Sequence, residues 1–163
     1  MGLDITAYKK IERIGNRDDD YDYKANQTVL CVNPSFPKQA DGLTDGIYQY
    51  EGTQVNFRAG SYGWYNDWRA ELAKMVGTTD EKLWENPDPK VPFIELINFA
   101  DNEGIIGPVT SKKLYNDFKK NHKKAKAWKS SIDADDQPWF LIKYRLWMRA
   151  FKLASNGGCV EFH

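Results

Sequence analysis

The sequence has few of the side chains on which metal sites and nucleophilic catalysis depend: its 163 residues include two cysteines and two histidines. Cys31 and Cys159 lie far apart, in no spacing typical of a metal site. His122 lies in a lysine-rich segment, His163 is the last residue, and no G-x-S-x-G motif occurs. Zinc catalysis uses three protein ligands, and a catalytic serine or cysteine needs a neighbouring base. The sequence therefore disfavours a zinc enzyme and a Ser–His–Asp enzyme, and we expect no metal or other cofactor.

Long apolar runs and an excess of charge of either sign are also lacking. No apolar run approaches the about 20 residues that a membrane-spanning helix needs, and the first residues show no basic segment followed by an apolar one. Lys and Arg number 23, as do Asp and Glu, so the formal net charge is zero. This balance disfavours nucleic-acid binding by the protein as a whole. We expect a cytoplasmic protein with reduced thiols that does not associate with membranes.

Aromatic residues, by contrast, are abundant: they make up 14% of the chain, with six Trp, nine Tyr and eight Phe. A chain of this length corresponds to one domain, and we expect a single domain over residues 1–163. Because the aromatic content is higher than average, some of these side chains should line a groove or a partner surface.

The order of hydrophobic patterns predicts an α+β fold. Alternation indicates strands in the N-terminal half and one at the C-terminus, and helical periodicity indicates helices between them. Segments 47–50 and 55–58 are predicted to form a hairpin. The C-terminal strand should pair beside the N-terminal one, giving a small antiparallel sheet packed against four to five helices. The predicted strands cover 3–11, 28–32, 47–50, 55–58 and 160–162, and the predicted helices cover 65–76, 79–86, 92–102, 110–130 and 138–155.

The helix predicted at 138–155 is the most apolar and is expected in the centre of the core. Its apolar stripe consists of Phe140, Tyr144, Trp147 and Phe151. Trp68 is also expected in the core, because its spacing to Leu72 and Val76 places the three residues on one helical face.

The segment 57–69, FRAGSYGWYNDWR, combines two arginines, a glycine-containing turn and aromatic side chains at the start of a predicted helix. Gly60 and Gly63 permit the positive φ of a turn. A helix N-terminus favours an anion, because its backbone N–H groups and the helix dipole carry partial positive charge. Aromatic faces suit a nucleobase or an apolar side chain. We therefore expect a ligand-binding site formed by Arg58, Ser61, Tyr62, Tyr65 and Arg69.

A second distinctive segment, 93–108 (FIELINFADNEGIIGP), is expected to face the first and to complete the site. Its contributing residues are Asn98, Asp101, Asn102 and Glu103. The ligand would be a small anionic molecule of nucleotide type or a host protein partner. A structural alternative stays open, in which Arg58 and Arg69 simply pair with the acids Asp67, Asp101 or Glu103.

An enzymatic alternative is a metal-assisted hydrolase that uses Asp101 and Glu103, with Asp4 or Glu95 as a further carboxylate. Carboxylates in such an arrangement can bind a divalent ion or exchange protons with a substrate. Asp101 and Glu103 are, however, two residues apart, so they do not face the same way on a helix. Their alternative role is to end the predicted helix by hydrogen bonding to the neighbouring loop.

A third alternative is nucleic-acid binding through the predicted 110–130 helix, which holds eight lysines between Lys112 and Lys129 and one acid, Asp117. A basic helical face can follow phosphates. The lysines are spread around the helix, and no arginine lies among them for base readout. The pattern therefore favours a solvated lysine-rich face, and nucleic acid is a disfavoured partner.

Four blocks of the sequence resemble a family of small phage and prophage proteins of no established activity. These blocks are MGLDITAY, FRAGSYGWYNDWRAELA, PFIELINFADNEGIIGPVTSKKLYNDF and CVEFH, and together they cover roughly half of the chain. In that family the glycine after the Ser-Tyr pair falls one position later, so Gly63 departs from the pattern. The resemblance implies an accessory protein in the bacterial cytoplasm and transfers no catalytic residue. We expect it to act by non-enzymatic binding, and inhibition or sequestration of a host-defence component would fit such a protein.

Overall fold

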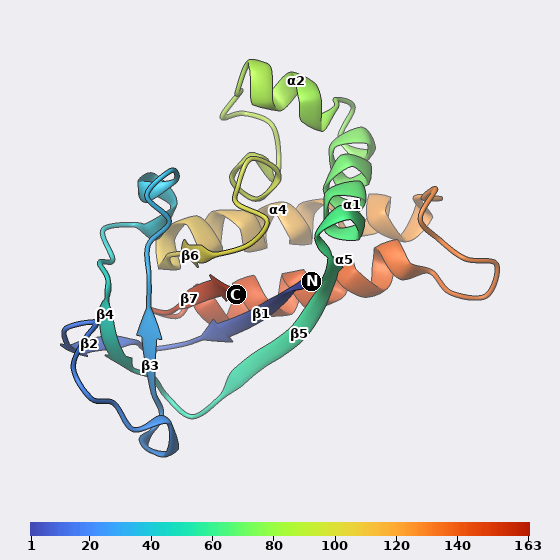
Figure 1. The fold of residues 1–163 in the computed structure, drawn as a ribbon. Coiled ribbons are helices and arrows are strands. Elements are labelled where there is room, and N and C mark those ends of the chain that lie inside the picture. Colours follow the sequence, from blue (N-terminus) through green and yellow to red (C-terminus); the bar gives the residue numbers. More distant parts are fainter.

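The computed structural model describes every residue from Met1 to His163 and confirms the α+β fold, with two antiparallel sheets and five α-helices (Figure 1). The strands are β1 (Gly2–Tyr8), β2 (Glu12–Gly15), β3 (Gln27–Leu30), β4 (Gly46–Gln49), β5 (Gln54–Ser61), β6 (Gly104–Ile106) and β7 (Cys159–Phe162). The helices are α1 (Tyr62–Met75), α2 (Asp80–Glu85), α3 (Ile94–Ile97), α4 (Pro108–Ala127) and α5 (Trp139–Ala154), with short 3-10 helices η1 (Tyr23–Ala25) and η2 (Pro37–Ala40). None of the helices has both the length and the apolar character needed to cross a membrane.

The larger sheet has the strand order β5-β1-β7-β6, with antiparallel neighbours throughout. The predicted pairing of the C-terminal strand beside the N-terminal strand is confirmed, since Ile5 lies opposite Phe162. Leu3, Ile5 and Ala7 alternate along β1 and belong to the same buried cluster as the apolar faces of the helices. The period-2 pattern of β1 therefore defines the side of the sheet on which the core forms.

The smaller sheet, of order β2-β4-β3, corrects one prediction. Segments 47–50 and 55–58 do not form a hairpin: β4 pairs with β2 and β3, whereas β5 pairs with β1. Both hydrogen-bonding edges of β4 are occupied, and β5 is paired from Ser61, opposite Gly2, to Gln54, opposite Tyr8. The short connection between the two segments is a local hairpin signal, and it contains no information about the longer partner that β1 offers.

Three predicted boundaries also differ from the structure. α1 begins at Tyr62, directly after β5, rather than at residue 65 or 66. The helix predicted over 92–102 is limited to Ile94–Ile97: the left-handed backbone of Phe93 (φ 67°) sets its start, and the helix already ends at the C-cap Asn98. Between the helices predicted at 92–102 and 110–130, where no strand was predicted, the structure has β6, in which Gly104 pairs with Phe162 at a φ of 125° that favours glycine.

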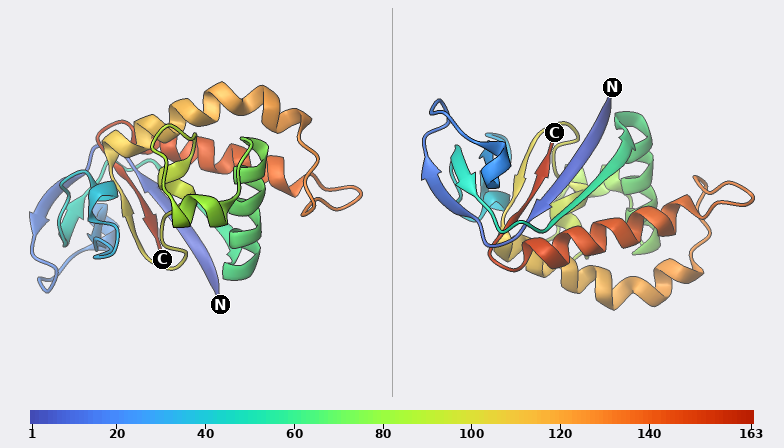
Figure 2. Two further views of the ribbon diagram at one scale, coloured as in Figure 1. Left: turned by 90° about the horizontal axis from the view of Figure 1, so that it is seen from above. Right: turned by 90° about the horizontal axis from the view of Figure 1, so that it is seen from below.

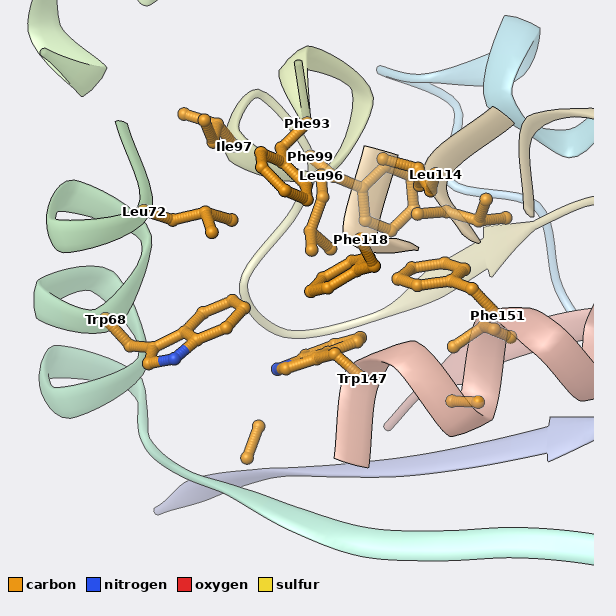
Figure 3. Packing of buried hydrophobic residues seen from close by; sticks show 14 of the residues in the cluster. Trp68, Leu72, Phe93, Leu96, Ile97, Phe99, Leu114, Phe118, Trp147 and Phe151 are labelled. Carbon is orange, nitrogen blue, oxygen red and sulfur yellow. The ribbon is translucent and has the colours of Figure 1, made fainter. Parts of the chain in front are cut away.

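Ten of the 28 buried residues in the main core cluster are aromatic, and Figure 3 shows several of them converging from different elements. Trp147 of α5 is in contact with Trp68 of α1, Phe57 of β5 and Phe162 of β7, at ring-centroid distances of 5.9, 5.1 and 5.5 Å. Aromatic pairs of this kind contribute about 0.5–1.5 kcal/mol beyond their buried area. The predicted apolar stripe of α5 is buried throughout, so its expected place in the centre of the core is confirmed.

A buried carboxylate on α1 fixes the segment that follows α4. Glu71, which is 4% exposed, accepts hydrogen bonds from the hydroxyl of Ser130 (2.7 Å), the indole N–H of Trp128 (3.2 Å) and both the hydroxyl and the backbone N–H of Ser131. Lys74 lies 2.9 Å from its other oxygen. Burial raises the pKa of Glu71, but these hydrogen bonds outweigh burial and lower its pKa from 4.5 to about 2.

We expect Glu71→Gln to lower the free energy of unfolding at pH 7 by about 1.5–3 kcal/mol, because hydrogen bonds to a charged acceptor are lost. The folded state lowers the pKa of Glu71, so its stabilisation is complete above the unfolded pKa of about 4.5 and is lost as the pH falls towards 2. The difference between wild type and variant should therefore shrink over this range in urea titrations. Glu85→Gln, at an exposed position of α2, is the control. A difference that is independent of pH would contradict the assignment.

Candidate functional site

The residues predicted to bind a ligand do not form one site, and Arg58 lies apart from the others. Its guanidinium makes an ion pair with Asp4 at 2.8 Å, and both side chains are about half exposed. Together with His163 these residues line a hollow of about 340 Å³ along β1 and β5. The acid that pairs with Arg58 is therefore Asp4, and not one of the three acids named in the structural alternative.

Ser61 ends β5 and Tyr62 begins α1, so the strand continues directly into the helix. The turn that was predicted around Gly60 and Gly63 is therefore absent. The Ser61 hydroxyl accepts a hydrogen bond from the backbone N–H of Trp64 (3.2 Å), so it caps the helix. Gly60 (φ 141°) is the position that needs glycine here, since a Cβ atom there would lie 2.7 Å from the Trp64 ring. The glycine in this segment thus serves the close packing of Trp64 on the end of the strand.

Tyr65 and Arg69 belong to the interior. The Tyr65 ring is fully buried and packs against both Trp68 and Trp147, which also contact each other, and its hydroxyl has no hydrogen-bond partner. Burial raises the pKa of Tyr65 well above its ordinary value. Arg69 is 7% exposed, and its guanidinium lies 4.6 Å from the centre of the Tyr65 ring.

The Arg69 guanidinium donates to the carbonyl oxygens of Ile97 and Phe99 and to the side-chain oxygen of Asn66. The amide nitrogen of Asn66 in turn donates to Asp101 at 3.2 Å. No carboxylate lies within ion-pair distance of Arg69, so Asp101 balances its charge through Asn66 rather than directly. This network ties α1 to the segment after α3.

The remaining predicted residues line a groove that sequence analysis did not identify. Three hollows of about 520, 500 and 260 Å³ share Trp84 of α2 as a wall, and we call them together the Trp84 groove. Arg69, Asp101, Asn102 and Glu103 line one of these hollows, and Asn98 lines another. The other principal walls are Phe36, Lys38, Gln39, Pro87, Pro89, Ile94, Glu95, Phe99 and Thr110.

Trp84 is 47% exposed, although Trp68 and Trp147 are fully buried. It lies on the six-residue helix α2, which is connected to α3 by a segment containing three prolines. Figure 1 shows α2 at one end of the molecule, above α3. The sequence does offer one signal for this residue, a tryptophan in a short, mostly charged helix next to prolines. A helix of six residues is, however, too short for its hydrophobic periodicity to show which side chains are exposed.

Polar and acidic side chains also line the Trp84 groove, and they differ in whether they already have partners. The amide nitrogen of Asn98 donates to the carbonyl of Leu83 (2.7 Å), which leaves its oxygen buried without a partner. Glu95 is paired with Lys113 at 2.7 Å. Asp101 and Glu103 line the same hollow as the rings of Phe36, Trp84 and Phe99.

Aromatic rings beside carboxylates form an environment for a cationic group. The Phe36 ring lies 6.1 Å from the Trp84 ring and 5.2 Å from the Phe99 ring, between centroids. A cation placed over such faces is attracted by about 0.5–2 kcal/mol, and neighbouring carboxylates add to this attraction. The chemistry of this hollow therefore suits a lysine or arginine side chain better than an anion.

The carboxylates considered for metal-assisted hydrolysis are not brought together. No group of three or more His, Cys, Asp or Glu side chains is placed to hold a metal ion. Asp4 is paired with Arg58 and Glu95 with Lys113, while Asp101 receives a hydrogen bond from Asn66. Asp101 and Glu103 line one hollow, but the further carboxylates, Asp4 and Glu95, are held elsewhere by their own cations.

Comparison of the chain with protein-family models, with curated proteins and with solved structures gave no match.

Because the Tyr65 hydroxyl is buried without a partner, Tyr65→Phe should leave the free energy of unfolding unchanged or raise it by up to about 1 kcal/mol. The matched control is Tyr144→Phe, since the Tyr144 hydroxyl is buried and donates to the carbonyl of Phe118 at 2.6 Å. That variant should lose about 1 kcal/mol. Urea denaturation of the three proteins makes the comparison, and an equal loss in both variants would show that the Tyr65 hydroxyl has a polar partner.

Proposed function

We propose that this chain is a non-enzymatic binding protein that holds a segment of a partner protein in the Trp84 groove. The observation that carries the proposal is the position of Trp84, which is 47% exposed and borders all three hollows. Partly exposed tryptophans in concave surroundings are typical anchors of protein interfaces, because they offer a large apolar area with little conformational freedom to lose.

The walls of the groove support a peptide-like occupant. Phe36, Trp84, Pro87, Pro89 and Ile94 line the largest hollow, so its surface offers apolar and aromatic contacts. Asn98 lines the same hollow with a buried amide oxygen that has no partner. The side chain of Asn98 is held by its hydrogen bond to the carbonyl of Leu83, so it is a fixed polar wall of this hollow.

Charge complementarity favours a protein segment with a basic side chain over a small anionic ligand. Asp101 and Glu103 line the hollow that contains the Phe36, Trp84 and Phe99 rings. Asp80 lines the smallest of the three hollows. Arg69 is the only Lys or Arg that lines these two hollows, and its guanidinium already donates to two carbonyls and to Asn66. A phosphate group would therefore face carboxylates, whereas a lysine or arginine would face carboxylates and aromatic rings.

The family resemblance provides the biological setting of the proposal. The blocks that carry it, from MGLDITAY to CVEFH, support a phage or prophage accessory protein that acts in the cytoplasm of a bacterial host. In this setting the partner would be a component of host defence that the protein inhibits or sequesters. Part of the third block, the segment DNEG, lines the Trp84 groove through Asp101, Asn102 and Glu103.

The test is selection of binding peptides from a random library on the full chain, followed by affinity measurement with variants. The expected peptides carry Lys or Arg next to apolar residues, and Trp84→Ala should weaken them at least tenfold, which corresponds to about 1.4 kcal/mol. Trp139→Ala is the matched control, because Trp139 is 39% exposed and lines none of the three hollows. Equal affinities for the two variants would overturn the proposal.

A second measurement separates the protein partner from the small anionic ligand. Thermal unfolding in the presence of nucleoside triphosphates should show no stabilisation, since the groove presents carboxylates to a phosphate. Stabilisation by about 2.7 kcal/mol at a ligand concentration one hundred times the dissociation constant, abolished by Trp84→Ala, would replace the peptide by a nucleotide as the ligand. Both variants should first be shown to unfold with the cooperativity of the wild type.

A further inference from the structure

The zero net charge of the chain conceals two regions of opposite charge. Residues 108–154, which comprise α4, α5 and their connection, contain twelve Lys and Arg and four Asp and Glu. The rest of the chain contains eleven Lys and Arg and nineteen Asp and Glu. The helical region therefore has a net charge of +8 and the remainder a net charge of −8. Composition alone cannot show this separation, because it averages over the whole chain.

The structure gathers the positive charge on one side of the molecule. Figure 2 shows α4 and α5 lying side by side in both views, along one edge of the fold. Their apolar faces, which include Leu114, Phe118, Tyr144 and Phe151, are buried in the core. The outward faces hold the cations, and the one acid within the two helices, Asp117, is paired with Lys113 at 2.8 Å.

Each of the two helices has an exposed row of cations at the same spacing. Residues at i, i+4 and i+7 share one helical face and span about 10 Å. We call these six residues the basic face: they are Lys119, Lys123 and Lys126 on α4, and Arg145, Arg149 and Lys152 on α5. None of the six makes an ion pair with a carboxylate.

His122 marks the place where the two rows meet. Its ring stacks on Tyr144 of α5 with a centroid distance of 6.0 Å, and its Nε2 atom is buried without a partner. Burial, together with the nearby charges of Lys126 and Arg145, lowers the pKa of His122. Because His122, which precedes Lys123, contacts Tyr144, which precedes Arg145, the two helices meet beside both rows, so the rows form one surface.

We propose that the basic face binds the phosphate backbone of duplex nucleic acid. Unpaired cations at this density repel one another, and a polyanion removes the repulsion. A duplex carries one negative charge for about every 1.7 Å of its axis, so several phosphates fall within the length of each cation row. The arginines of α5, which lie outside the lysine-rich segment, add planar donors that match phosphate geometry.

Two other polyanionic surfaces fit the basic face less well. A helix that lies on a membrane places an apolar face among the lipids, but the apolar faces of α4 and α5 are already buried in the core. Single-stranded nucleic acid needs exposed aromatic rings for base stacking. On α4, Phe118 is buried, and Tyr115 is half-buried and lies under the ammonium group of Lys119 at 5.0 Å. On α5, the exposed Trp139 is the first residue of the helix, outside the basic face. Backbone contact with a duplex requires neither feature.

This proposal is independent of the Trp84 groove, and its test uses the full chain with a fluorescently labelled duplex DNA of about two helical turns. Fluorescence anisotropy should show binding at low salt, with an affinity that falls steeply between about 50 and 200 mM salt. Lys123→Glu/Arg145→Glu should bind at least about tenfold more weakly, and the slope of log K against log salt should decrease in magnitude by about 2.

The matched control, Lys24→Glu/Lys90→Glu, makes the same change of net charge at exposed positions outside the basic face. It should bind within about twofold of the wild type, and both double variants should show wild-type thermal unfolding. An equal loss in the control would show non-specific attraction, and absence of binding at low salt would overturn the proposal. Retention on vesicles of anionic phospholipid without binding of the duplex would assign the basic face to a membrane surface instead.

Discussion

The buried guanidinium of Arg69 is the interaction on which the arrangement of the candidate site depends. It donates to the carbonyls of Ile97 and Phe99, where α3 has ended and the backbone has no helical partner for these oxygens. Unpaired carbonyls at this depth would cost several kcal/mol, on the order of 2 kcal/mol or more each. Arg69 thereby stabilises an irregular segment inside the protein, and this segment carries Asn98 and Asp101 to the Trp84 groove.

The same interaction explains why the two distinctive sequence segments meet through the core rather than across an open pocket. Tyr65 packs against both Trp68 and Trp147, and Arg69 lies over the Tyr65 ring. Tyr65, Trp68 and Arg69 of segment 57–69 are thus buried by packing in the core. The exposed recognition chemistry is left to Trp84 and Phe36, which come from other parts of the chain.

The protein presents two surfaces with different physical character. The Trp84 groove combines aromatic and proline walls with carboxylates, whereas the basic face has exposed cations and no exposed aromatic ring. A protein segment in the groove and a duplex on the basic face would bind different elements, α2 and the loops around it in one case and α4 with α5 in the other. Neither surface needs a catalytic group.

Local patterns were sufficient to predict elements whose partners are determined by a continuous apolar face. The stripe of α5 and the pairing of β7 with β1 belong to this class, because periodicity alone places their apolar side chains on one side. The hairpin of segments 47–50 and 55–58 failed, because the turn signal is local and the better partner, β1, lies about fifty residues away. The helix predicted over 92–102 is only four residues long: the left-handed backbone of Phe93, which has no signature in residue type, delays its start, and after Ile97 the carbonyls pair with Arg69 instead of continuing the helix.

The sequence by itself determined the α+β class, the core positions of the helices and the residues from which a site could be built. Only the tertiary structure decided which of them are exposed: it buried Tyr65 and Arg69, paired Arg58 with Asp4, and placed Asp101 and Glu103 beside Trp84. It also brought the cations of α5 next to those of α4. The physical reason is that exposure and charge proximity depend on contacts between segments distant in the chain, whereas periodicity reports only the environment of each segment separately.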